Sequence, residues 1–177
     1  MNRATRVVLQ PLDRETYGAG AGGELSLGRD GALLVRFGVP QGLRGHVVEA
    51  YVVLHRTRRP TDSSVSLHAG RYSSSPDRWP SNKSASPRPE GAAGATTHVD
   101  RQSPSLVRVD VHTLVDEAIL ASVQKTAKNA EENKRSVVVT DDLVVAVAGA
   151  CDDPDGEGMA FAASSSDGPV LEIYLRE

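Results

Sequence analysis

The sequence predicts an all-β protein: a jelly-roll-like antiparallel sandwich with one inserted helix. Short segments of alternating apolar and polar residues recur along the chain, with Gly, Pro, Asp and Ser between them. The apolar spacing lengthens to a helical period near 113–130. The final apolar stretch, PVLEIYL, indicates that the C-terminal end is tied into a sheet. A length of 177 residues, with no internal repeat and no second core, favours one domain spanning residues 1–177.

The first strands are expected before residue 72. The stretch GELSLGRDGALLVRFGV reads as two strands joined by a tight Asp-Gly hairpin turn. In VVEAYVVLHR, alternate residues form a wholly apolar face, and we expect this face to be buried. The segment SSVSLHAGR continues the alternation as the next strand. The residues expected to point inward are Leu33, Val35, Phe37, Val39, Val48, Ala50, Val52, Leu54, Val65, Leu67 and Ala69.

The middle of the chain changes character twice. Residues 73–105 are rich in Pro, Ser, Gly and Ala and read as one long loop, a feature that is usually functional or without fixed structure. SLVRVDV is a strand in which Val107, Val109 and Val111 are expected to face inward, and the helix at about 113–130 follows it. Thr113 and Asp116 resemble a capping box at the start of this helix. Its inward-facing residues are expected to be Leu114, Val115, Ala118 and Ile119.

Four apolar segments complete the predicted sandwich: SVVVTDD, LVVAVAGA, GMAFAAS and PVLEIYL. Residues 164–169 are expected to turn the chain between the final two strands, which are expected to be antiparallel to each other. In the final strand Leu171, Ile173 and Leu175 point inward, and Glu172, Tyr174 and Arg176 point outward.

Composition excludes several classes of function. Lys and Arg number 20 against 23 Asp and Glu, so the chain has no general attraction for nucleic acid. The single cysteine, Cys151, rules out an internal disulfide and a cysteine metal cluster. No apolar run has the length of a signal peptide or a membrane span, which predicts cytoplasmic synthesis and no membrane insertion. Membership of a particle or a released assembly is compatible with this prediction.

Four segments give the chain a resemblance to a known family. They are ALLVRFGVPQGLRGHVVEAYVVLHR, PDRWPSN, VRVDVHTLVDEAI and FAASSSDGPVLEIYL. Their strands, turns and single Trp resemble the DNRLRE-type, disaggregatase-related β-sandwich domains. The likeness runs from about Leu25 to Leu175 and implies a jelly-roll sandwich, in a family with some members associated with carbohydrate binding or cell-surface structure.

Aromatic residues are the first candidates for contact with a ligand or partner. Trp79 lies in the Pro- and Ser-rich segment, where it could bind a sugar ring, anchor a partner or pin the loop to the sandwich. The further aromatic candidates are Tyr51, Tyr72 and Tyr174.

Charged residues give two more candidate sites. The acidic loop at 151–158 could bind calcium through Asp152, Asp153, Asp155 and Glu157, although it lacks the pattern of an EF-hand and also fits a solvated turn. No other cofactor is expected. The basic stretch 55–59 could form a patch or a solvated strand end. His55 and His68 fall on neighbouring predicted strands, but none of the five histidines has a catalytic spacing.

We therefore expect a non-catalytic interaction module, a structural or assembly component of the coat, appendage or decoration type. Its partner would be a protein or further copies of itself, as a homo-oligomer or larger assembly. The strands SVVVT and LVVAVAGA carry no Lys, Arg or Glu, and the second face around Tyr51 is apolar; both features favour association. The alternatives are a loop 73–105 that covers this face, a carbohydrate-binding module with a glycan partner, and a hydrolytic enzyme.

Overall fold

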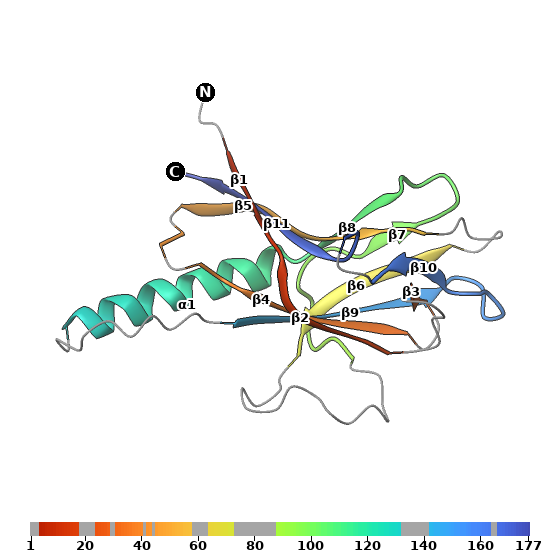
Figure 1. The fold of residues 1–177 in the computed structure, drawn as a ribbon, viewed down its shortest axis with the longest axis horizontal. Coiled ribbons are helices and arrows are strands. Elements are labelled where there is room, and N and C mark those ends of the chain that lie inside the picture. Colours follow the sequence, from red (N-terminus) through yellow and green to blue (C-terminus); the bar gives the residue numbers. More distant parts are fainter. Residues whose placement is uncertain are drawn as a thin grey trace.

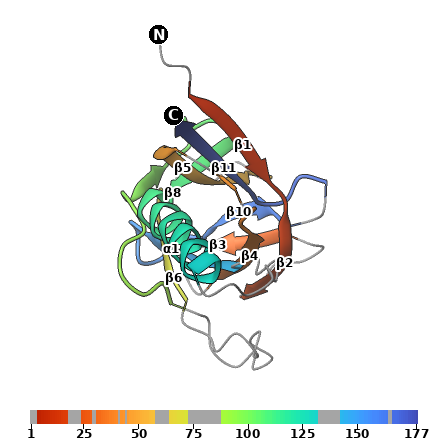
Figure 2. The ribbon, with the colours of Figure 1, turned by 90° about the vertical axis from the view of Figure 1, so that its left-hand side faces the viewer.

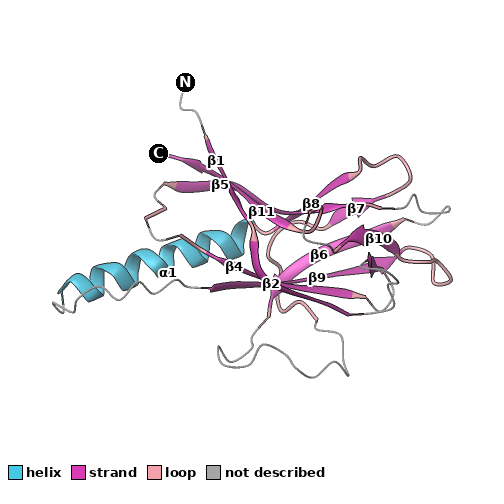
Figure 3. Ribbon diagram, viewed as in Figure 1, coloured by secondary structure: helices cyan, strands magenta, loops and turns pink. Residues whose placement is uncertain are grey.

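The computed structural model of the chain describes residues 4–17, 24–28, 31–40, 42–43, 45–57, 64–72, 88–131, 142–163 and 166–177. These residues form antiparallel strands and one helix, as the sequence predicts (Figure 3). The elements are β1 (Thr5–Leu9), β2 (Pro11–Tyr17), β3 (Glu24–Leu27), β4 (Ala32–Gly38), β5 (His46–His55), β6 (Val65–Arg71), β7 (Thr97–Val99), β8 (Leu106–Asp110), α1 (His112–Glu131), β9 (Asp142–Cys151), β10 (Met159–Ala162) and β11 (Val170–Arg176).

Two sheets face each other across the core (Figure 1). Sheet A has the order β1-β11-β5-β8, and sheet B has the order β2-β4-β9-β6-β7. A separate two-stranded sheet pairs β10 with β3. The C-terminal strand β11 lies inside sheet A between β1 and β5, which places the chain end in a sheet as expected.

Alternate residues of both sheets fill the space between them. Leu33, Val35 and Phe37 of β4 are fully buried, and they share a core cluster with Ala50 and Val52 of β5. Burying a Val, Leu or Phe side chain contributes about 1.5–3 kcal/mol. The predicted inward positions of β6, β8 and β11 are buried as well. The two-residue period therefore identified most of the core correctly.

The register of β5 is the exception. The ladder between β11 and β5 shifts at Tyr174 and Leu175, which pair with Glu49 and Val47 and leave Val48 without a partner. This bulge turns Val47 inward, where it is 7% exposed, and turns Val48 outward, where it is 38% exposed. The prediction that Val48 points into the core was wrong, because an extra residue in one strand reverses the alternation beyond it.

Two predicted connections were also wrong. β3 and β4 were expected to form a hairpin, but β3 pairs with β10 whereas β4 pairs with β2 and β9. The last two strands, β10 and β11, lie in different sheets, so residues 164–169 do not join hydrogen-bonded neighbours. Proximity in sequence was a poor guide to pairing because each connection here passes between sheets.

Helix α1 lies at one end of the sandwich, beside β5 of sheet A and β9 of sheet B (Figure 2). It buries Leu114, Val115 and Ile119, as predicted, and packs against β5 and β9. The predicted capping box is wrong: Thr113 lies inside the helix and its N–H donates to the carbonyl of Ala93 at 3.0 Å. Asp110 provides the cap, accepting a hydrogen bond from the N–H of His112 at 2.9 Å.

The remaining differences concern the N-terminus and the long loop. β1 and β2 were not predicted; they pair with β11 and β4 respectively. The segment read as one loop, 73–105, contains β7, which pairs with β6. Residues 73–87 and the predicted strand SVVVT lie outside the described residues. Within the described part of the chain, no helix is long and apolar enough to cross a membrane.

Candidate functional site

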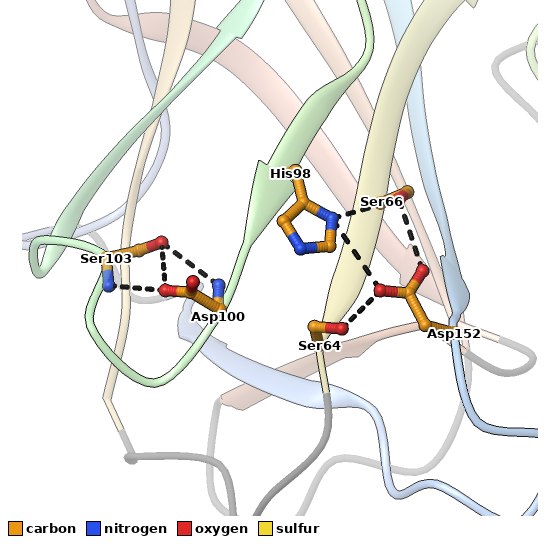
Figure 4. Close-up of polar contacts among 6 residues, drawn as sticks. All are labelled: Ser64, Ser66, His98, Asp100, Ser103 and Asp152. Atoms are coloured by element: carbon orange, nitrogen blue, oxygen red, sulfur yellow. Dashed lines mark hydrogen bonds and ion pairs between the residues drawn. The ribbon is translucent and has the colours of Figure 1, made fainter.

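A cluster of polar side chains lies where β6, β7 and the end of β9 meet (Figure 4). His98 of β7 is directly opposite Ser66 of β6, and Asp152 follows β9. The Ser66 hydroxyl lies 3.4 Å from Nδ1 of His98 and 3.4 Å from Oδ1 of Asp152. The Ser64 hydroxyl also donates to Asp152. These are the residue types of a nucleophilic hydrolase, so their geometry decides whether they could act as one.

The geometry does not fit a proton relay. The carboxylate of Asp152 lies 3.6 Å from Nδ1 of His98, the same ring nitrogen that Ser66 approaches. In a Ser-His-Asp relay the serine hydroxyl and the carboxylate bind opposite nitrogens of the imidazole ring. One nitrogen can then accept the proton of the hydroxyl while the carboxylate orients the ring through the other nitrogen. The side chains of His98 and Asp152 are also 57% and 46% exposed. The arrangement therefore lacks the opposed contacts of a Ser-His-Asp relay.

The neighbouring turn at Asp100 is held by its own hydrogen bonds. Oδ1 of Asp100 accepts from the N–H group of Gln102 at 2.9 Å. It also accepts from the N–H group of Ser103 at 2.8 Å and from the Ser103 hydroxyl at 2.9 Å (Figure 4). The Ser103 hydroxyl and these N–H groups lower the pKa of Asp100. Arg56 donates to the carbonyls of Asp100 and Ser103 at 2.7 and 2.6 Å. Arg56, from the predicted basic stretch, therefore fixes a loop; Arg58 and Arg59 lie outside the described residues.

The candidate calcium ligands point in different directions. Asp152 faces Ser64 and Ser66, whereas Oδ1 of Asp153 accepts the N–H of Asp155 within the turn at 3.0 Å. Glu157 is exposed. Among the described residues, no three His, Cys, Asp or Glu side chains are grouped closely enough to hold a metal ion. His55 and His68 are not on neighbouring strands, because β5 and β6 belong to different sheets.

The outer face of sheet A, the side turned away from sheet B, is built around a buried carboxylate. Glu172 of β11 is only 3% exposed, although its neighbours Leu171 and Ile173 fill the core on the other side of the strand. Arg6 of β1 forms an ion pair and hydrogen bond with Oε1, and Nε of Arg108 in β8 donates to Oε2 at 3.2 Å. One carboxylate thus connects the two edge strands of the sheet.

The electrostatics of Glu172 follow from these contacts. Burial alone raises the pKa of a carboxyl group, but the hydrogen bonds and charges of Arg6 and Arg108 outweigh burial and lower the pKa of Glu172. The hydroxyl of Tyr174 also donates to Oε2, at 3.3 Å. Both arginine side chains remain about half exposed, 54% for Arg6 and 46% for Arg108. The carboxylate therefore stays charged and holds two accessible guanidinium groups in place.

Two tyrosines complete this face. The rings of Tyr51 and Tyr174 meet edge to face, with centroids 6.5 Å apart and an interplanar angle of 73°. Tyr51 lies opposite Glu172 in the ladder, and Tyr174 lies opposite both Arg6 and Glu49. Burial and the nearby Glu49 raise the pKa of Tyr51. We call this surface, with Arg6, Glu49, Tyr51, Arg108, Glu172 and Tyr174, the tyrosine–arginine face.

The four aromatic candidates do not form one site. Tyr51 and Tyr174 share the tyrosine–arginine face, but Tyr72 packs on the opposite side of the sandwich against a cluster that includes Tyr17 and Leu34 of sheet B. Trp79 lies outside the described residues. Arg6 and Arg108 were missed because no local motif marks them. Their one sequence signal is Glu172, an outward acidic residue between the apolar Leu171 and Ile173. A carboxylate at such a position needs a positive partner if it is covered.

No protein-family model matches this chain, and no curated protein matches it either. The resemblance to DNRLRE-type domains therefore stays a prediction from the sequence.

Proposed function

We propose that this chain is a non-catalytic interaction module, a structural or assembly component that makes protein contacts through the tyrosine–arginine face. The observation that carries the proposal is the Arg6–Glu172–Arg108 network beside the Tyr51–Tyr174 pair. Tyr and Arg are enriched in the energetically dominant parts of protein interfaces. The network also fixes guanidinium groups before a partner arrives, which reduces the side-chain entropy lost on binding.

Stability alone gives little reason for this network. A buried ion pair must overcome the desolvation of its charges, and apolar replacements are often equally stable. If Arg6 and Arg108 were replaced by apolar residues as well, an apolar residue at the strand position between Leu171 and Ile173 could be equally stable. A charged Glu172 that holds two half-exposed arginines is better explained by recognition of a partner.

A carbohydrate-binding module is the second candidate, because aromatic rings on a sheet face can stack on sugars. The edge-to-face arrangement favours it less. One ring directs its edge at the face of the other, so the two do not form a flat platform for successive sugar units.

The test compares two charge reversals in affinity capture from the cells that produce the protein. Glu49→Lys changes the tyrosine–arginine face, whereas Glu157→Lys makes the same change in the exposed 151–158 loop. We expect a protein that is captured by the parent and by Glu157→Lys but not by Glu49→Lys. Equal capture by all three chains would contradict the proposal. Loss of glycan binding from the Glu49→Lys chain on a glycan array would favour the carbohydrate alternative instead.

A further inference from the structure

The two main sheets have four edge strands: β1 and β8 in sheet A, and β2 and β7 in sheet B. An edge strand presents unpaired N–H and C=O groups that can pair with another chain, and proteins usually block such edges with charge, proline, short length or a covering segment. The four edges can therefore be compared for their protection.

Three edges carry such protection. β2 begins at Pro11 and contains Asp13, Arg14 and Glu15. β7 is only 3 residues long. On β8 the carbonyl of Arg108 accepts the Thr97 hydroxyl at 2.9 Å, and β7 lies beside this edge.

β1 has none of these features. Its sequence, TRVVL, contains no proline and no acidic residue, and within the described part of the chain it pairs with β11 alone. Its one charge, Arg6, is bound to Glu172 on the outer side of its own sheet and so does not guard the edge. Val8 is 42% exposed, and Figure 2 shows β1 at the outer margin of sheet A.

We propose that β1 pairs with β1 of a second copy of this chain, in antiparallel orientation about a two-fold axis. The four-stranded sheet A of each copy would then continue into that of the other. Side chains alternate between the two faces of a strand. The core is therefore preserved only in registers that pair positions facing the core with each other, and positions facing outward with each other. Thr5, Val7 and Leu9 are the inner positions, and Arg6 and Val8 are the outer ones.

The strand is self-complementary in one such register. Centring the axis on Val7 places Val7 opposite its own copy, Thr5 opposite Leu9, and Arg6 opposite Val8, and it overlaps all 5 residues of the strand. Centring it on Arg6 would oppose two guanidinium groups, which destabilises a cross-strand pair. Because the same residues serve both partners, the contact is closed and predicts a dimer.

This inference uses the strand edge and does not require the tyrosine–arginine face to bind anything. Failure of one proposal therefore leaves the other standing. In particular, Glu49→Lys should leave the dimer intact.

Sedimentation velocity of the purified full chain over a range of concentrations tests the pairing. Val8→Lys would place a lysine opposite Arg6 of the other copy twice per dimer. We expect the dissociation constant of the dimer to rise roughly tenfold or more. Val123→Lys is the matched control, because Val123 is 54% exposed and lies on helix α1, outside sheet A. We expect dimers for the parent and the control. A parent that stays monomeric at high concentration, or a Val8→Lys chain that still dimerises like the parent, would overturn the inference.

Hydrogen exchange separates strand pairing from other dimers. Amides of β1 whose N–H groups face the free edge should exchange quickly when the protein is dilute and slowly when it is concentrated. A dimer in which β1 exchange does not change with concentration would contradict pairing through this edge.

Discussion

At the scale of single residues, Glu172 shows how a carboxylate can be both buried and charged. Two arginines from separate strands donate to it, so the pKa of Glu172 lies below its usual value despite its 3% exposure. The sequence predicted its outward direction correctly. Its burial was not predictable, because Arg6 and Arg108 lie far from it in the chain and meet it only when β1, β11, β5 and β8 pair.

Glu172→Gln should therefore lower stability near neutral pH, by about 1.5–3 kcal/mol, the range for hydrogen bonds to charged groups. The pKa of Glu172 is lower in the folded than in the unfolded protein, so the folded state gains stability from it above the unfolded pKa. This gain disappears as the pH falls through the folded pKa. The difference between parent and variant in urea unfolding should thus shrink as the pH is lowered into the acidic range. A difference that stays constant would mean that the charge of Glu172 does not stabilise the fold.

At the scale of elements, the apolar period predicted which residues are buried better than which strands are partners. A two-residue period depends on local sequence, and it identified the inward faces of β4, β6, β8 and β11. Partners depend on how connections cross between sheets, and the predicted hairpin of β3 and β4 failed for this reason. LVVAVAGA lies in β9, which is central in sheet B between β4 and β6, so its low charge reflects burial and not an open edge.

The helix gives a direct test of packing. On α1, Ile119 is 5% exposed on the packed face of the helix, whereas Leu120 next to it is 54% exposed. Ile119→Asp would bury an unpaired charge and should cost several kcal/mol, about 3 or more. Leu120→Asp introduces the same group in water and should change stability by about 0.5 kcal/mol or less. Thermal unfolding of the two variants compares them. Similar melting temperatures would mean that α1 is not packed on the sandwich as described.

The start of the same helix depends on Asp110. Its carboxylate accepts the N–H of His112 through Oδ1 and the N–H of Ala95 through Oδ2 at 3.0 Å. Asp110→Ala removes both acceptors and should destabilise the protein by about 1–2 kcal/mol, as for the loss of a helix cap. Asp110→Asn keeps one acceptor oxygen and should cost less. If the two variants unfold at the same denaturant concentration as the parent, the helix must be capped in another way.

At the scale of the whole molecule, the tyrosine–arginine face lies on the outer side of sheet A, and helix α1 packs on another part of the sandwich. The sequence marks Tyr51 and Tyr174 as candidates for contact with a ligand or partner, because both alternate with core residues on strands. It could not show that they touch, since that contact depends on the pairing of β5 with β11. Tyr72, on the far side of the molecule, serves as an internal control for the role of the tyrosine–arginine face.

Hydroxyl-radical footprinting tests the central claim most directly, because tyrosine rings are modified only where solvent reaches them. The chain would be oxidised once as purified protein and once in an extract of the cells that produce it, and the modified tyrosines would be quantified. If the face binds a protein, Tyr51 and Tyr174 become protected in the extract, protection survives glycosidase treatment, and Tyr72 is modified equally in both samples. Equal modification of all three tyrosines in the two samples, or protection of Tyr72 alone, would contradict the account.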